Sequence, residues 1–200
     1  MKRIHVAAVL VMVLGQLAHA ADWTLLVPKI EASVVAIMTK TGGCTGVVID
    51  NDRDFVLTAA HCDGPEMYVD LAPAKIKAKD VKNDLMVVHV EGIDRPEIKL
   101  ALVNPKIGDE VASYGYGYAM ERPLFRVAHI SDNQGRVDGQ SGSEFMIIDS
   151  SFVPGQSGGP VVNTKGEMVM LVQMGNDIVG LGVGAETLKL KVGKYFAGGK

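Results

Sequence analysis

The sequence predicts an all-β fold of two antiparallel β-barrels with a short C-terminal helix. Short segments rich in β-branched and other apolar residues recur along most of the chain, and many alternate between apolar and polar positions. Gly, Pro, Asn and Asp residues separate these segments. The segments form two groups of about six, one on each side of Pro105, which fits a pair of barrels. The chain of 200 residues, 48% of them hydrophobic, can form one compact unit or two small units that share an interface.

The first group of strands belongs to a predicted N-terminal barrel, residues 21–104. Its strands are predicted at residues 33–39, 45–50, 55–58, 67–71, 76–81, 85–90 and 99–103. The second group belongs to a predicted C-terminal barrel, residues 105–200, with strands at residues 110–114, 124–130, 144–149, 161–163, 168–174 and 179–184. A polar loop is expected at residues 131–143. Residues 186–196 end the fold as a helix or, by the alternation of residues 188–192, as a further strand.

Residues 1–20 have the pattern of a secretory signal peptide. Lys2 and Arg3 precede an apolar run of roughly a dozen residues, and Ala18-His19-Ala20 is a small-x-small cleavage site. The apolar run is shorter than the ~20 residues that cross a bilayer, so a membrane anchor is the weaker alternative. The protein is therefore expected to be secreted or periplasmic, with no stable membrane anchor after signal removal. The net charge of -3 gives no support to a nucleic-acid partner.

A glycine-rich segment has the composition of a nucleophile loop: Gly155-Gln156-Ser157-Gly158-Gly159-Pro160. A serine hydroxyl is a weak nucleophile, so catalysis needs a base within hydrogen-bond reach and donors for the negative charge that develops on the substrate. Glycine on both sides allows a tight turn whose amides point outward. The alternative is an ordinary glycine-rich turn before a strand.

The expected base lies upstream, in Leu57-Thr58-Ala59-Ala60-His61-Cys62, where an apolar strand runs into small residues and then a histidine. With this histidine motif and the GxSGGP serine motif in this order, the chain resembles the trypsin-like (chymotrypsin-fold) serine endopeptidases. The resemblance implies chymotrypsin-type barrels and favours the helix at residues 186–196. It also implies that His61 removes the Ser157 proton during attack on a peptide carbonyl, while the backbone amides of Gly155 and Ser157 bind the oxyanion.

The third catalytic residue is expected to be Asp84, in Val81-Lys82-Asn83-Asp84-Leu85-Met86-Val87-Val88. An aspartate that opens an apolar strand can be buried where two barrels meet, and it can fix the tautomer of the imidazole. The context is similar to the Asp-Leu-apolar segment of the family. Asp80 and Asp63 are the alternatives, and Asp80 lies in a lysine-rich stretch that suits a surface turn.

The resemblance narrows around Ser157. Residues 149–163 are similar to the HtrA (Deg) group of trypsin-like proteases, as are residues 166–169 and 179–185. No PDZ-type domain follows before Lys200, and the interval from His61 to Asp84 is short for that group. Both departures weaken the case for an HtrA-style oligomeric cage or peptide-sensing regulation, and the sequence leaves the oligomeric state open.

The chain has two cysteines, Cys44 and Cys62, and an exported protein would carry them into an oxidising compartment. A disulfide between them is expected, and the family resemblance implies the same pairing. It would tie the strand that starts at Cys44 to the turn that carries His61. The alternative is two free thiols or a half-formed metal site, for which the sequence holds no matching Cys/His cluster. No metal or other cofactor is predicted.

The resemblance also implies a primary pocket for the substrate side chain. Its walls would be formed by uncharged residues from three segments, namely Ser151, Phe152, Val153, Gln173, Met174, Gly175 and Val183. Small or medium apolar side chains are therefore the expected preference. The predicted function is an exported serine endopeptidase that acts on unfolded or extended polypeptides through an acyl-enzyme. The alternative is a catalytically inactive or latent peptide-binding module with the same fold.

Overall fold

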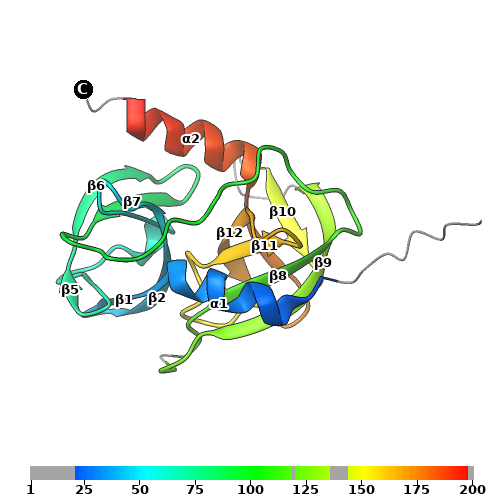
Figure 1. Cartoon of the computed structure of the whole chain (residues 1–200), viewed down its shortest axis with the longest axis horizontal. Helices are drawn as coiled ribbons and strands as arrows, with labels where there is room; N and C mark the ends of the chain where they lie inside the picture. Colours follow the sequence, from blue (N-terminus) through cyan, green and yellow to red (C-terminus); the bar gives the residue numbers. More distant parts are fainter. Residues whose placement is uncertain (1–20, 119, 136–143, 198–200) are drawn as a thin grey trace, which may run out of the picture.

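Strands make up most of the regular secondary structure, and Figure 1 shows them in two groups that lie side by side. The computed structural model describes residues 21–118, 120–135 and 144–197. The predicted signal peptide, residues 1–20, lies outside the described residues. The prediction of an all-β fold with a C-terminal helix is confirmed, and the first of the two barrels is a half-barrel.

The N-terminal group is a seven-stranded antiparallel sheet that curves into the half-barrel. Its order is β5-β4-β1-β2-β3-β7-β6, with β1 (Val34–Thr39), β2 (Gly42–Asp50), β3 (Phe55–Thr58), β4 (Tyr68–Val69), β5 (Ala72–Pro73), β6 (Lys75–Asp80) and β7 (Leu85–His89). β3 pairs with β2 on one side and with β7 on the other. Val56, Leu57 and Thr58 are fully buried, so the residues that follow β3 extend from a rigid part of the sheet.

The C-terminal group is a closed barrel of six antiparallel strands. Its order is β10-β13-β12-β11-β8-β9, with β8 (Glu110–Gly115), β9 (Leu124–Gly135), β10 (Phe145–Ile148), β11 (Pro160–Asn163), β12 (Met168–Gly175) and β13 (Gly180–Gly184). The Ser157 segment connects β10 to β11, and β11 pairs with both β8 and β12. The C-terminal end of the segment is thus anchored by a strand that is paired on both sides.

The first helix, α1 (Trp23–Ser33), is an element that the sequence pattern does not predict. Asp22 caps the N-terminus of α1, because its side-chain carboxylate accepts a hydrogen bond from the Thr24 N–H at 3.1 Å. Trp23, Leu26 and Ile30 lie on one face of α1, against the core between the two groups of strands. Tertiary packing thus stabilises an 11-residue helix that would be marginal in isolation.

Two further helices complete the fold. The 3-10 turn η1 (Ala60–Cys62) follows β3 directly. α2 (Ala185–Ala197) follows β13 and lies across the top of the molecule in Figure 1. The buried side chains of Leu188 and Val192, four residues apart, explain why the stretch is a helix rather than an alternating strand. None of the described helices is long and apolar enough to cross a lipid bilayer.

Two predicted elements differ from the structure. Residues 99–103 form no named strand, and Leu100 makes a single bridge with Met168. Leu102 and Val103 are exposed, so this connection lacks the buried face that a barrel strand would need. Residues 131–135 belong to β9 rather than to the expected polar loop, because their backbone pairs with β10. The remainder of that loop, residues 136–143, lies outside the described residues.

Buried apolar residues form three clusters. One lies within the N-terminal sheet and includes Val35 and Met86, and another fills the C-terminal barrel with Ile148 and Met170. The third joins the two groups of strands and the two α-helices. The site described below lies where the two groups meet, so this third cluster determines its geometry.

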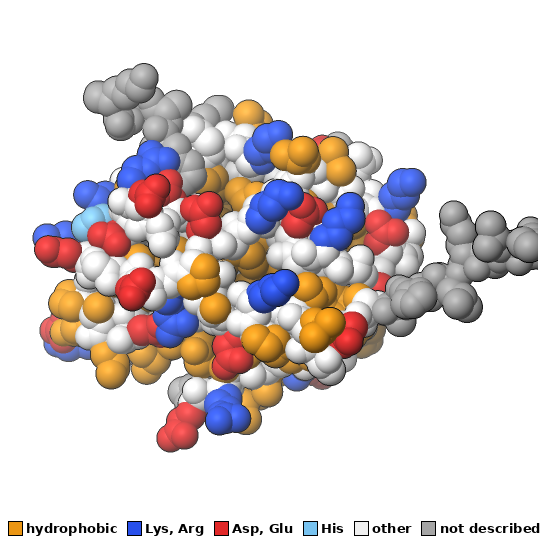
Figure 2. Space-filling model, viewed as in Figure 1, with side chains coloured by type: hydrophobic (Ala, Val, Ile, Leu, Met, Phe, Trp, Pro, Cys, Tyr) orange, Lys and Arg blue, Asp and Glu red, His pale blue; other side chains and the backbone are white. Residues whose placement is uncertain are grey.

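Figure 2 shows positive, negative and hydrophobic side chains interspersed over the visible face. This mixture agrees with the small net charge of -3. The visible face therefore offers no extended basic surface of the kind that binds a phosphate backbone.

Candidate active site

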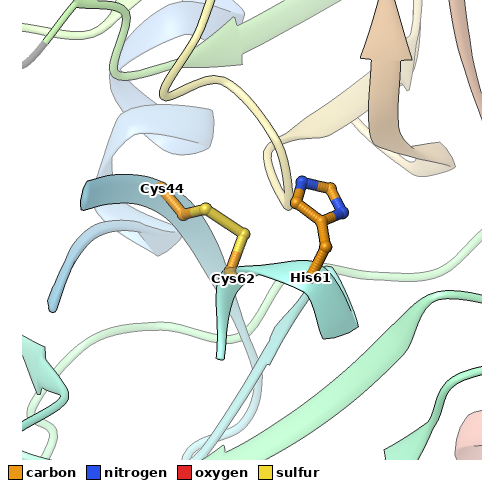
Figure 3. Close-up of side chains that lie close together, drawn as sticks. All are labelled: Cys44, His61 and Cys62. Atoms are coloured by element: carbon orange, nitrogen blue, oxygen red, sulfur yellow. A yellow bond between two sulfur atoms is a disulfide. The ribbon is translucent and has the colours of Figure 1, made fainter. Parts of the chain in front are cut away.

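His61 lies at the exposed tip of η1, directly after the buried end of β3. Ala59 and Ala60 are buried, so the chain leaves the sheet with small side chains and then presents the imidazole to solvent. A disulfide joins Cys62 in η1 to Cys44 in β2, with a Cα–Cα distance of 6.1 Å. Figure 3 shows the imidazole beside this disulfide. The predicted pairing is present, and it ties the turn that carries His61 to the sheet.

Asp84 lies in the turn between β6 and β7 and contacts His61 through both carboxylate oxygens. Its Oδ1 accepts a hydrogen bond from the His61 backbone N–H at 2.8 Å, and its Oδ2 lies 2.7 Å from His61 Nδ1. With the proton on Nδ1, the imidazole donates to Asp84 and leaves Nε2 as an acceptor. This tautomer is the one that a general base needs.

The two other candidate aspartates make different contacts. Asp63 pairs with Lys79 at 2.6 Å. Asp80 accepts hydrogen bonds from the backbone N–H and side-chain amide of Asn83, at 3.1 and 2.7 Å. Of these aspartates, Asp84 is the one in hydrogen-bond contact with His61.

Ser157 follows β10 in a tight segment whose carbonyls are bound by β2. Thr45 donates from its hydroxyl to Gly155 O at 2.8 Å and from its backbone N–H to Ser157 O at 2.9 Å. Within the described residues, the N–H groups of Gly155 and Ser157 donate to no other group. Free backbone N–H groups are the kind of donor that an oxyanion requires.

The hydroxyl of Ser157 donates to the backbone carbonyl of Gln173 at 3.0 Å. His61 and Ser157 line one cavity of about 270 Å³, together with Gly155 and the disulfide. In the described part of the chain, no hydrogen bond joins the Ser157 hydroxyl to the His61 imidazole. Catalytic hydrogen bonds are often formed only when substrate is present.

Thr45 is a residue of this site that the motifs do not reveal. It is fully buried, its hydroxyl also accepts from the Tyr116 N–H at 2.9 Å, and its carbonyl accepts from the Thr58 hydroxyl at 2.8 Å. Thr45 thus connects the half-barrel to the Ser157 segment. The available signal was a threonine in an otherwise apolar strand directly after Cys44.

The residues of the predicted primary pocket lie in different surroundings. Phe152 is buried among the side chains that fill the C-terminal barrel, and a Cβ on Gly175 would lie 3.0 Å from Phe152 Cβ. The two predicted pocket segments that contain Phe152 and Gly175 are therefore in contact. Val183 is buried in the cluster between the two groups of strands. Val153 N–H donates to the side-chain oxygen of Gln156 at 3.0 Å.

Ser151 contacts a charged residue that the sequence does not place there. Arg126 of β9 donates from Nη1 to Ser151 O at 2.6 Å and to Ser151 Oγ at 2.9 Å. A positive charge thus lies beside residues 150–156, which are themselves uncharged.

A second cavity, of about 580 Å³, also has His61 in its lining. It brings Gln173 and Met174 together with residues of the Asp84 turn, and its lining is Ala60, His61, Lys79, Val81, Lys82, Asn83, Asp84, Phe145, Gln173 and Met174. Gln173 and Met174, two of the three predicted pocket residues of β12, therefore share a cavity with His61 and Asp84.

One group of side chains among the described residues has the spacing of a metal site: Cys44, His61 and Cys62. Its two sulfur atoms are bonded to each other, so neither is a thiolate that could bind an ion. The pairing accounts for both cysteines of the chain.

A family model described as the trypsin-like peptidase domain matches residues 44–170. The match includes His61, Asp84 and Ser157. Among curated relatives, the "probable periplasmic serine endoprotease DegP-like" of Pseudomonas fulva is 31% identical over 134 residues, which are 62% of this chain and 27% of the relative. The "probable serine protease do-like" of Buchnera aphidicola is 24% identical over 134 residues, 62% of this chain and 28% of the relative. The chain thus spans less than a third of the length of these relatives.

Solved structures show a similar fold. The serine endoprotease from Yersinia pestis matches with a TM-score of 0.77 and 22% identity, over 90% of this chain and 69% of that chain. A protein from M. tuberculosis H37Rv in an inactive form matches with a TM-score of 0.75 and 21% identity, over 90% of this chain and 97% of that chain. At these sequence identities, the comparison with solved structures shows similarity of fold only.

Proposed function

Because the chain belongs to the family of trypsin-like peptidase domains, we propose that it is a serine endopeptidase that cleaves unfolded or extended polypeptides. The observation that carries this proposal is the contact of Asp84 with His61 on the rim of the cavity that contains Ser157. The half-barrel supplies the base and its aspartate, and the closed barrel supplies the serine.

The proposed reaction is acyl transfer. His61 Nε2 accepts the Ser157 proton as the hydroxyl oxygen attacks the peptide carbonyl, and Asp84 stabilises the imidazolium that forms. The free N–H groups of Gly155 and Ser157 bind the negative oxygen of the tetrahedral intermediate. His61 then protonates the leaving amine, and a water molecule attacks the acyl-enzyme in the same way.

We also propose that the protein acts outside the cytoplasm, in the periplasm or as a secreted enzyme. Residues 1–20 have the pattern of a signal peptide, and the Cys44–Cys62 disulfide suits an oxidising compartment. The name of the Pseudomonas fulva relative includes the word periplasmic. Fractionation of cells that produce the full chain, with N-terminal sequencing of the product, tests the proposal. Product that retains residues 1–20 in the cytoplasm would contradict it.

The decisive experiment compares the protein with its Ser157→Ala variant. A serine-directed fluorophosphonate probe and casein cleavage report on the nucleophile and on proteolysis. We expect both signals in the wild type, and a loss of ~10⁶-fold in kcat in the variant. Ser131→Ala is the matched control, because Ser131 is an exposed serine on β9. Labelling that survives in Ser157→Ala would refute the assignment of the nucleophile.

A peptide-binding module without turnover is the second candidate. It is favoured by the Ser157 hydroxyl, which donates to Gln173 O instead of His61, and by Phe152, a predicted wall of the primary pocket that is buried among the side chains of the closed barrel. Wild-type protein that binds casein but neither labels nor cleaves would support this second function.

A further inference from the structure

Gln173 reaches from the C-terminal barrel to the turn that carries Asp84. It lies on β12 with only 3% of its surface exposed. Its side-chain Nε2 donates to Asn83 O at 2.6 Å and lies 3.3 Å from Asp84 O. One amide group therefore binds two consecutive backbone carbonyls of a turn that is about 90 residues away in the sequence.

The turn that receives this amide has an unfavourable backbone conformation. Asp84 has a backbone φ of 50°, in the left-handed region that residues other than glycine rarely adopt. Such a conformation persists when surrounding contacts hold it. Asn83 is held from two directions, because Asp80 accepts its N–H and its side-chain amide while Gln173 donates to its carbonyl.

The direction of the Asp84 carboxylate depends on this turn. Both carboxylate oxygens contact His61, one at the backbone and one at the imidazole. A rotation of the Asp84 backbone would move the two oxygens together and break both contacts. Gln173 also accepts the Ser157 hydroxyl at its own carbonyl, so one residue contacts the two halves of the site.

We propose that Gln173 is a positioning residue, whose side-chain amide holds the turn so that Asp84 faces His61. The inference rests on the proposed peptidase function, since it assigns Gln173 a part in that reaction. Gln173 was predicted as a wall of the substrate pocket. The side-chain contacts add a different role, in which it acts on the reaction through Asp84.

The test is Gln173→Met, which keeps the length of the side chain and the backbone carbonyl but removes the donor. We expect kcat for a peptide substrate to fall by ~10- to 100-fold, as when a supporting hydrogen-bond partner of a catalytic group is removed. KM changes little, because the Gln173 amide is occupied by the Asn83 and Asp84 carbonyls and methionine keeps the bulk of this pocket wall. The acid limb of the kcat/KM profile moves to lower pH, because a misdirected carboxylate stabilises the imidazolium less.

A spectroscopic measurement follows the same contact without turnover. The proton between His61 Nδ1 and Asp84 Oδ2 is expected to give a downfield NMR signal in the wild type, and this signal weakens in Gln173→Met. Gln134→Met is the control, because Gln134 is an exposed glutamine on β9. It is expected to keep the wild-type signal, kcat and pH profile.

Asp80→Ala releases Asn83 from the other side and keeps the inference testable if Gln173→Met does not fold. We expect the same change in the acid limb, and a double variant that loses less than the product of the two single losses. If the wild type is active and Gln173→Met keeps the wild-type acid limb and NMR signal, the role of Gln173 is refuted while the proposed peptidase function stands. A wild type that neither labels nor cleaves would overturn the proposed function, and the assignment of Gln173 to that reaction with it.

Discussion

Two glycines of the Ser157 segment have backbone angles that other residues disfavour. Gly155 has a φ of 99° and Gly158 a φ of 83°. A Cβ on Gly155 would lie 2.6 Å from Tyr116 O, and a Cβ on Gly158 would lie 2.1 Å from Thr45 O. Backbone oxygens cannot move aside as flexible side chains can. Both positions therefore require glycine for conformation and for space.

We expect Gly155→Ala to lower kcat by ~10²- to 10³-fold, because the displaced backbone removes one of the two oxyanion donors. Steady-state kinetics on a peptide substrate measures the change. Gly92→Ala is the matched control, since Gly92 also has a positive φ, of 73°, but no atom within 4 Å of an added Cβ. It should cost stability with little change in kcat. Equal kcat values in the two variants would contradict the role of Gly155.

At the scale of elements, the disulfide joins β2 to η1. Cys44 and Cys62 are 18 residues apart, a loop whose closure stabilises a chain by about 3 kcal/mol in the chain-entropy model. The loop contains β3, so the bridge restrains both ends of the segment that positions His61.

A double variant, Cys44→Ala with Cys62→Ala, is expected to unfold ~6 to 12 °C below the wild type, because it loses this restraint. Thermal unfolding followed by circular dichroism measures the difference. Treatment of the wild type with a dithiol reductant should lower its Tm towards that of the variant and leave the variant unchanged. Equal melting temperatures would show that the bridge contributes nothing.

The contact between α2 and the Asp84 turn depends on pH. Lys191 of α2 lies 3.7 Å from Asp80. Burial raises the pKa of Asp80, but hydrogen bonds from Asn83 and the charge of Lys191 outweigh it, so the pKa lies below its ordinary value of 3.8. A lowered pKa means that Asp80 stabilises the fold fully above the ordinary value. The contribution is lost as pH falls through the folded-state pKa.

We therefore expect the wild type to lose more stability than Asp80→Asn when the pH falls below about 4, because only the wild type loses a carboxylate here. Urea unfolding between about pH 3 and pH 6 measures the free energy of unfolding of both proteins. Comparing the two curves removes the effect of the other acidic residues. Parallel curves over the whole range would contradict the assignment of this pH dependence to Asp80.

At the scale of the whole molecule, one apolar cluster joins the half-barrel to the closed barrel. Leu57 and Leu85 contribute to it from the half-barrel, Leu171 from the closed barrel, and Ile30 and Leu188 from the two α-helices. All five are at least 98% buried. Since His61 and Ser157 come from different halves, the geometry of the site depends on this cluster.

Leu171→Ala is expected to reduce the free energy of unfolding by about 2 to 5 kcal/mol and to keep a single unfolding transition, because both halves share the affected cluster. Differential scanning calorimetry and urea unfolding measure both features. Leu25→Ala is the control, since Leu25 is 68% exposed and its truncation should cost less than about 0.5 kcal/mol. Separate transitions for the two halves would contradict a shared core.

Most strands and the family were predictable from the sequence, because both depend on local patterns. Alternation and turn residues located β3 at residues 55–58 without error. The pattern missed α1, because one face of that helix is recognisable only against a core built from distant residues. It assigned a strand to residues 99–103 because exposed apolar residues have the same composition as a buried strand.

The sequence by itself determined the candidate nucleophile, the candidate base and the pair of cysteines, since each lies in a short motif with its own chemistry. Only the tertiary structure decided that Asp84 contacts His61, that Phe152 is buried in the barrel, and that Arg126 contacts Ser151. Only the tertiary structure also reveals the hydrogen bond from the Gln173 side chain to Asn83 O, which joins residues 90 positions apart. Such contacts depend on how two separately patterned groups of strands pack together, and no local pattern carries that information.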